Sequence, residues 1–138
     1  MLTLKDKGLL FYIIEHCKRI EEKIKDKSKE YFYSDKDTIE IVCFNILQIG
    51  ELVKNFSDDF INIYNKMPWK EIKGMRDWVA HGYGTIDLDK VWDTALNGIT
   101  LLKNYCKYIL SIEKLMKKGA SNSLSFSFCF HTSFDPRV

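Results

Sequence analysis

Apolar residues recur along most of this chain at alternating steps of three and four, the spacing of one face of an α-helix. The spacing predicts a first helix over residues 4–27, whose buried stripe is Leu10, Ile13, Cys17, Ile20 and Ile24. Residues 28–37 have no sustained period. We therefore expect a loop there, closing on Ser34 or Asp35 as the N-cap of the next helix.

The second predicted helix, residues 38–56, is apolar on nearly every side and should be the central helix of the domain. Its stripe is Val42, Ile46, Ile49, Val53 and Phe56. Asn45, Gln48 and Glu51 interrupt it three apart and form one narrow polar row. Because buried polar groups need partners, we expect this row to face a polar cleft or another subunit. Gly50 costs about 1 kcal/mol relative to Ala in a helix, unless something approaches it closely.

The rest of the chain body also has helical spacing. Ser57 is the expected N-cap of a short amphipathic helix, and Pro68 lies in the first turn of the following one. The inner face of that helix is Ile72, Met75 and Val79, and Gly82 and Gly84 should end it. Asp87 should cap the last helix, whose stripe is Leu88, Trp92, Ala95, Ile99, Leu102, Cys106 and Ile109. The prediction is an all-α, up-down bundle of four long helices and one short one.

Composition narrows the class of protein. A chain of 138 residues with 46% hydrophobic and 29% charged residues is of the globular type and the size of one domain. Its 7 Gly and 2 Pro argue against a many-turned β-sandwich. The formal net charge of +2 is too balanced to indicate a nucleic-acid binder by bulk electrostatics. Any such role must therefore rest on a local patch.

Cysteine spacing and the last twenty residues bear on location and domain limits. The four cysteines are far apart, no signal-peptide cleavage site is visible, and no stretch reaches about 18 apolar residues. We expect a cytoplasmic protein with reduced thiols and no membrane segment. Residues 1–118 should form the domain. Residues 119–138 are Ser/Phe-rich with a period of two, which indicates a non-native or disordered tail, or alternatively a genuine C-terminal strand or arm.

The candidate chemistry is concentrated in RDWVAHGY, residues 76–83. A guanidinium, an imidazole and a phenol near a helix end suit the handling of phosphate. Arg76 and His81 would point about 140° apart on an ideal helix. The glycine after His81 lets His81 and Tyr83 turn back toward Arg76, and Lys70 and Lys73 extend the basic flank.

These residues also allow a purely structural interpretation. Arg76 could pair with Glu51 or Asp77, and His81 could merely cap the helix. The side chains alone leave both interpretations open.

RDWVAHGY resembles the R-x4-6-H-x-Y motif of HEPN-domain proteins. FNILQIGELVKNFS (44–57) and MPWKEIKGMRDWVAHGYGTIDLDKVW (67–92) narrow the resemblance to HepT-like ribonuclease toxins of prokaryotic toxin–antitoxin pairs. It covers roughly residues 4–117 and has no counterpart for the tail. The resemblance implies a HEPN-like homodimer that cleaves RNA as an endoribonuclease without a metal or other cofactor, with Arg76 and His81 as catalytic residues contributed by both subunits.

The resemblance also implies a partner, a minimal nucleotidyltransferase antitoxin that attaches AMP to Tyr83 and itself uses ATP and Mg²⁺. Cleavage through the 2′-hydroxyl fits the composite site, because it needs a base, an acid and a cation, and each chain has one motif histidine. A two-fold axis would supply a second His81 and a second Arg76. Lys70 and Lys73 would then bind substrate. The expected positioning residues are Asn45, Gln48, Glu51 and Asp77, with Glu51 best placed to orient Arg76.

Two other classes of function stay open at this point. The first is a non-catalytic HEPN module that binds the nucleotidyltransferase as an adaptor, although an adaptor would not need Arg76, His81 and Tyr83 together. The second is a structural helical dimer, which leaves the polar row unexplained.

Overall fold

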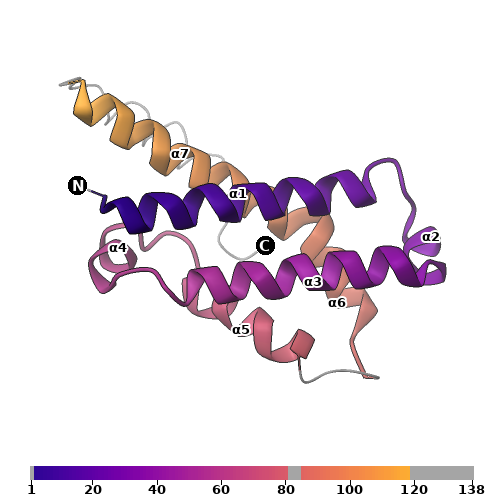
Figure 1. The fold of residues 1–138 in the computed structure, drawn as a ribbon. Coiled ribbons are helices and arrows are strands. Elements are labelled where there is room, and N and C mark those ends of the chain that lie inside the picture. Colours follow the sequence, from indigo (N-terminus) through magenta and orange to yellow (C-terminus); the bar gives the residue numbers. More distant parts are fainter. Residues whose placement is uncertain (1, 81–84, 119–138) are drawn as a thin grey trace.

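The computed structural model describes residues 2–80 and 85–118, and within these ranges all regular structure is helical. The helices are α1 (Leu4–Ile24), α2 (Lys29–Ser34), α3 (Lys36–Val53), α4 (Asp58–Ile63), α5 (Trp69–Ala80), α6 (Leu88–Asp93) and α7 (Ile99–Lys117), with a π-helical segment at Thr94–Gly98. Successive long helices run in alternating directions (Figure 1). The predicted all-α up-down bundle is confirmed, and the described residues contain three short helices, α2, α4 and α6, where one was expected.

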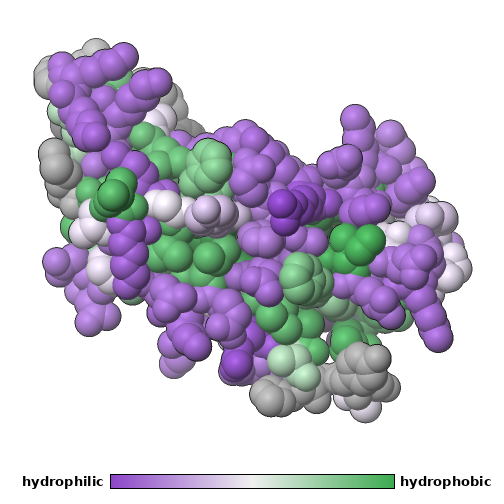
Figure 2. All heavy atoms as spheres, viewed as in Figure 1, coloured by the Kyte–Doolittle hydropathy of each residue, from purple (hydrophilic) through white to green (hydrophobic). Residues whose placement is uncertain are grey.

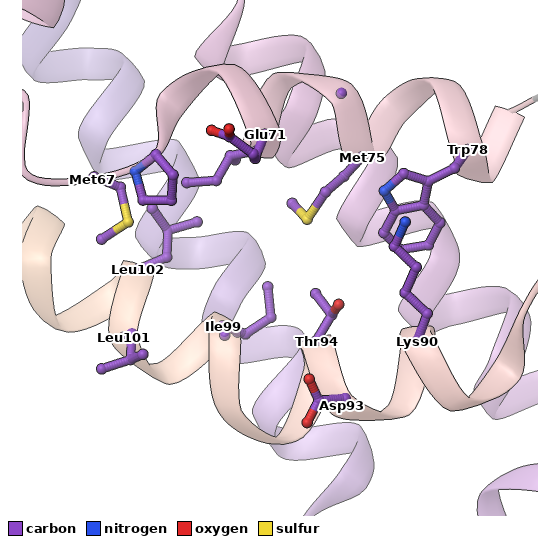
Figure 3. A pocket seen from close by; sticks show the side chains of 14 residues that line it. Met67, Glu71, Met75, Trp78, Lys90, Asp93, Thr94, Ile99, Leu101 and Leu102 are labelled. Atoms are coloured by element: carbon purple, nitrogen blue, oxygen red, sulfur yellow. The ribbon is translucent and has the colours of Figure 1, made fainter. Parts of the chain in front are cut away.

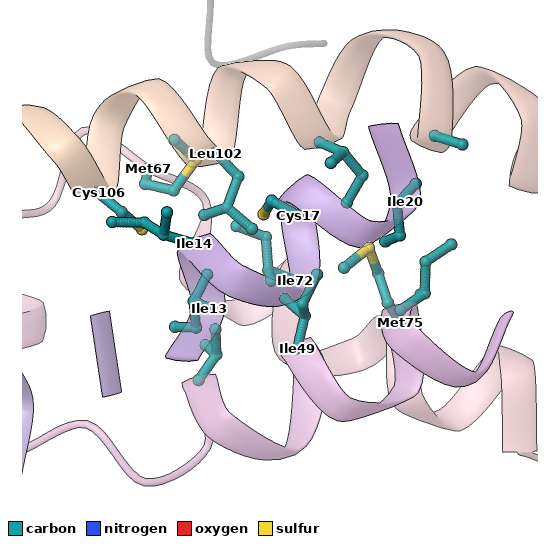
Figure 4. Packing of buried hydrophobic residues seen from close by; sticks show 14 of the residues in the cluster. Ile13, Ile14, Cys17, Ile20, Ile49, Met67, Ile72, Met75, Leu102 and Cys106 are labelled. Carbon is teal, nitrogen blue, oxygen red and sulfur yellow. The ribbon is translucent and has the colours of Figure 1, made fainter. Parts of the chain in front are cut away.

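The long helices pack in the order α7, α1, α3, α5, so that α3 lies between α1 and α5. Side chains from α1, α3, α5 and α7 meet in one core cluster (Figure 4). The predicted stripes of the first and second helices are buried throughout, and so is the predicted inner face of α5. Among the described residues, no helix is both long enough and apolar enough to cross a membrane.

The segment predicted as a loop contains a helix. Ser28 caps α2 by accepting a hydrogen bond from the backbone N–H of Tyr31, and Phe32 is buried. One buried position in six residues leaves no period to detect, which is why the pattern missed this helix. Asp35, one of the two predicted residues, is at the N-cap of α3, but its carboxylate accepts hydrogen bonds from the side chains of Thr38 and Tyr31. These hydrogen bonds lower the pKa of Asp35.

The last predicted helix is interrupted. Asp87 caps α6 as expected, accepting from the backbone N–H groups of Asp89 and Lys90. The π-helical segment then separates α6 from α7. Its wider turn changes the buried stripe, which runs through Val91, Ala95, Ile99, Leu102, Cys106 and Ile109, whereas the predicted members Leu88 and Trp92 are only half-buried.

Three cysteines are buried in the core as small apolar side chains. Burial raises the pKa of the Cys43 thiol to about 11 and moves the pKa values of Cys17 and Cys106 further above their ordinary range. None of these three thiols forms a disulfide, and because their pKa values are raised, all three are protonated at neutral pH. Cys129 lies outside the described residues.

Candidate functional site

The candidate site is built where α5 crosses α3. The Nε of Arg76 on α5 is paired with the carboxylate of Glu51 on α3, and its Nη1 lies 3.2 Å from Oδ1 of Asp77. Glu51 also lies 3.5 Å from Nζ of Lys54. The Arg76 and Glu51 side chains are 41% and 33% exposed. The guanidinium is therefore held by carboxylates on two sides while it stays accessible to solvent.

Close packing of the two helices places this pair. Gly50 is buried in α3, and a Cβ added there would lie 2.9 Å from the Cβ of Arg76. The sequence left open whether something approaches Gly50 closely; the structure shows that the backbone of α5 does.

The polar row on α3 is divided between two environments. Asn45 is buried, its Oδ1 lies 2.8 Å from Nδ1 of His16 on α1, and its Nδ2 donates to the carbonyl of Ile41. Because Nδ2 is the donor, Oδ1 is left to accept from the His16 ring. Asn45 thus has partners within its own subunit, which corrects the expectation that the whole row must face a cleft or a second chain. Gln48 is half-buried, and Glu51 is directed at Arg76.

The sequence analysis missed the hydrogen bond that His16 makes with Asn45. It lies half-buried on α1, and its partner Asn45 is 29 positions away in the chain. The available signal was a histidine beside the apolar stripe of the first helix and a buried amide on the second. Only the packing of α1 against α3 brings the two together.

Basic residues extend the site along α5. Lys70, Lys73 and Arg76 follow at steps of three, and both lysines are exposed. Among the residues that the structure describes, neither lysine has a carboxylate within 4.0 Å. His81 and Tyr83, the other two members of the motif, lie outside the described residues, so their predicted placement stays a prediction.

The opposite side of α5 borders a cavity of about 400 Å³ (Figure 3). Its lining is mainly apolar, and Lys90 Nζ lies 4.7 Å from the ring centroid of Trp78 at one end. Neither Arg76 nor Glu51 lines it, so this cavity is separate from the candidate site. Across residues 2–80 and 85–118, no three His, Cys, Asp or Glu side chains are grouped so that they could hold a metal ion.

Comparison with known proteins decides the family. Residues 13–109 match the family described as "Ribonuclease HepT-like". The chain belongs to the HepT-like ribonuclease family. The sequence-based prediction of a HEPN-type endoribonuclease is thereby confirmed at the level of the family, and RNA is the substrate class that this assignment implies.

Curated relatives support this assignment over most of their length. A protein of Caldanaerobacter subterraneus subsp. tengcongensis named "Putative RNase" is 36% identical over 105 residues, which cover 76% of this chain and 94% of that protein. A Methanocaldococcus jannaschii protein with the same designation is 34% identical over 118 residues, or 86% and 95% of the two chains. "Probable ribonuclease HepT" of Thermococcus cleftensis is 34% identical over 111 residues, or 80% and 96%. No solved structure matches the HepT-like chain.

Proposed function

We propose that this HepT-like protein is a cytoplasmic, metal-independent endoribonuclease toxin that cleaves RNA by attack of the 2′-hydroxyl at a site shared by two subunits. We further propose that a minimal nucleotidyltransferase antitoxin neutralises it by adding AMP to Tyr83. The family assignment and the half-exposed Arg76, paired with Glu51, support the ribonuclease part. The names of the three relatives described above give ribonuclease activity alone. The toxin role and the antitoxin are tested separately.

The pairing of Arg76 is the observation that carries the chemistry. Glu51 and Asp77 engage Nε and Nη1, and a guanidinium has five N–H groups, so others can donate to phosphate oxygens. A cation in this position would stabilise the negative charge that develops on the non-bridging oxygens of the phosphorane as the 2′-oxygen attacks.

In the proposed reaction, His81 of one subunit accepts the proton of the 2′-hydroxyl while the new P–O bond forms. His81 of the second subunit, in its protonated form, donates a proton to the departing 5′-oxygen as the old P–O bond breaks. The products are a 2′,3′-cyclic phosphate and a 5′-hydroxyl, with no external oxidant or nucleophile required. Lys70 and Lys73 would hold the flanking phosphates.

An exposed aromatic residue on the outward face of α3 supports the proposed dimer. Phe44 is 57% exposed, and Glu51 lies seven positions further along, on the same side of the helix. On α1, Phe11 and Tyr12 are also exposed, and apolar residues interrupt the polar surface along both helices (Figure 2). We infer that these exposed aromatic residues belong to the dimer interface, because aromatic residues are enriched at the cores of protein–protein interfaces. A second copy that covers Phe44 would bring its own α3 and α5 beside the Glu51–Arg76 pair, which is what a shared site requires.

End-group analysis of RNA incubated with the purified protein tests the reaction. We expect 2′,3′-cyclic phosphate and 5′-hydroxyl ends, undiminished cleavage in EDTA, and no cleavage at a nucleotide carrying 2′-deoxyribose. Full loss of activity in EDTA, or cleavage of the deoxy-substituted position, would point to a different mechanism. RNA that stays intact while the nucleotidyltransferase binds would favour the adaptor function.

A further inference from the structure

Helices α3 and α5 touch almost backbone to backbone at one point. A Cβ built on Gly50 would lie 2.9 Å from the Cβ of Arg76, 3.1 Å from its backbone nitrogen and 3.3 Å from the carbonyl oxygen of Ile72. Real Cβ atoms essentially never come closer than 3.0 Å to a heavy atom of another part of the chain. The atoms in the way belong to the backbone of α5 or are bonded directly to it, so rotating a side chain cannot relieve the contact.

Gly50 also precedes Glu51, and the residue that it touches is the one that Glu51 pairs with. The Arg76 guanidinium is half-exposed, so its position depends on where the α5 backbone lies and on the carboxylates that hold it. The buried neighbours Ile49 on α3 and Ile72 and Met75 on α5 lie together in the core beside this contact (Figure 4).

We propose that Gly50 is a positioning residue of the ribonuclease site, because the missing Cβ sets the α3–α5 separation at which Glu51 holds the Arg76 guanidinium. The inference rests on the proposed function insofar as Arg76 is taken to act on the phosphate. A methyl group at Gly50 cannot stay 2.9 Å from the Cβ of Arg76, and an ordinary contact, which begins at 3.4 Å, requires α5 to move by about 0.5 Å. A displacement on the order of 1 Å can reduce a rate about 10²-fold.

The test is Gly50→Ala, with Gly74→Ala and Gly8→Ala as matched controls. Both control glycines are helical, and a Cβ at either position meets nothing within 4 Å. We expect kcat for RNA cleavage to fall about 10²-fold in Gly50→Ala. The change in KM should be smaller, because the exposed Lys70 and Lys73 have long, flexible side chains that can still reach phosphate after α5 shifts. Both controls should keep the parental kcat and melt at or above the parental temperature, because Ala favours a helix over Gly.

A spectroscopic measurement separates positioning from general loss of stability. The chain has three arginines, Arg19, Arg76 and Arg137, so the Nε–H signals in a ¹H–¹⁵N spectrum can be assigned by single substitutions. The Arg76 signal should shift, and its proton should exchange faster with water, in Gly50→Ala and in Glu51→Ala but not in the two controls. A parental Arg76 signal together with parental kcat in folded Gly50→Ala overturns the inference.

A second comparison covers the case in which Gly50→Ala folds poorly. Arg76→Ala keeps the Cβ that lies 2.9 Å away, whereas Arg76→Gly removes it. Gly50→Ala should therefore lower the melting temperature less in the Arg76→Gly background than in the Arg76→Ala background. Equal decreases in melting temperature in both backgrounds would show that the Gly50–Arg76 contact does not set the helix separation. If the parent protein does not cleave RNA, the proposed function fails, whereas the spectra and the melting comparison still test Gly50.

Discussion

Glu51 on α3 pairs with the Nε of Arg76 on α5, so a carboxylate and a guanidinium 25 positions apart in the chain are joined across the interface of two helices. An ion pair this exposed contributes about 1 kcal/mol or less to stability. Its proposed role is therefore to orient Arg76 rather than to hold the fold.

Glu51→Ala should reduce cleavage markedly while changing the free energy of unfolding by no more than about 1 kcal/mol. Glu51→Gln should keep part of the activity, because its amide oxygen can still accept from Nε. Steady-state cleavage rates and urea unfolding of the same preparations measure the two effects. The control is Glu22→Ala, which removes an exposed carboxylate on α1. A loss of activity that only tracks a loss of stability would assign Glu51 a structural role.

Arg76→Ala and His81→Ala should each abolish detectable cleavage while the helical circular dichroism signal is preserved. Loss of a general acid–base group typically costs about 10²–10⁴-fold in rate. Arg76 is half-exposed, so its truncation should leave the core intact. Cleavage at the parental rate by His81→Ala would show that the assignment of His81 is wrong.

The shared site predicts that Phe44→Glu yields a monomer with little activity, because a charge on an apolar contact surface opposes association. Light scattering at micromolar concentration checks the mass. Ile63→Glu, an equally drastic change at an exposed residue of α4, is the control and should leave the dimer intact. A parental protein that is monomeric at this concentration would remove the composite site.

Mixing Arg76→Ala with His81→Ala subunits extends the test of the dimer. Partial activity in the mixture is expected if the two residues act across the interface. If the mixture shows no activity, either each subunit carries a complete site or every site needs Arg76 and His81 from both subunits.

Tyr83 is the expected acceptor of AMP. Incubation with the cognate nucleotidyltransferase, ATP and Mg²⁺ should add one or more AMP masses to the peptide containing Tyr83 and should abolish RNA cleavage, because the added phosphate would compete for Arg76. Tyr83→Phe should escape modification and keep its fold.

Two other tyrosines serve as internal controls for that experiment. Tyr105 is 3% exposed, and burial raises its pKa to about 12. The hydroxyl of Tyr64 donates to Glu113, and burial raises its pKa as well. Both are poor acceptors in the folded protein, and AMP on either of them would contradict the regulatory proposal.

The buried carboxylate of Asp6 joins the first turn of α1 to the start of α4. It accepts hydrogen bonds from the backbone N–H and from the hydroxyl of Ser57, at 3.1 and 2.7 Å. Asp6→Ala should lower the free energy of unfolding by about 2 kcal/mol, because the Ser57 donors lose their buried partner. Urea unfolding measures the change, and Asp59→Ala, an exposed carboxylate in the first turn of α4, should have little effect.

Local pattern was sufficient for most of the secondary structure. Stripes such as Leu10 to Ile24 predicted the long helices, because a face that must be buried imposes its period on the sequence. Caps such as Ser57 and Asp87 were predictable because they satisfy backbone groups within a few residues. Helix α2 was missed because it buries only Phe32, and a single position carries no period.

The sequence by itself determined the all-α class, the positions of the long helices and the family motif. Only the tertiary structure decided which groups meet: Arg76 with Glu51 and with the Gly50 backbone, and Asn45 with His16. The reason is physical. Burial and capping act between residues a few positions apart, whereas these contacts join different helices and depend on how the helices pack.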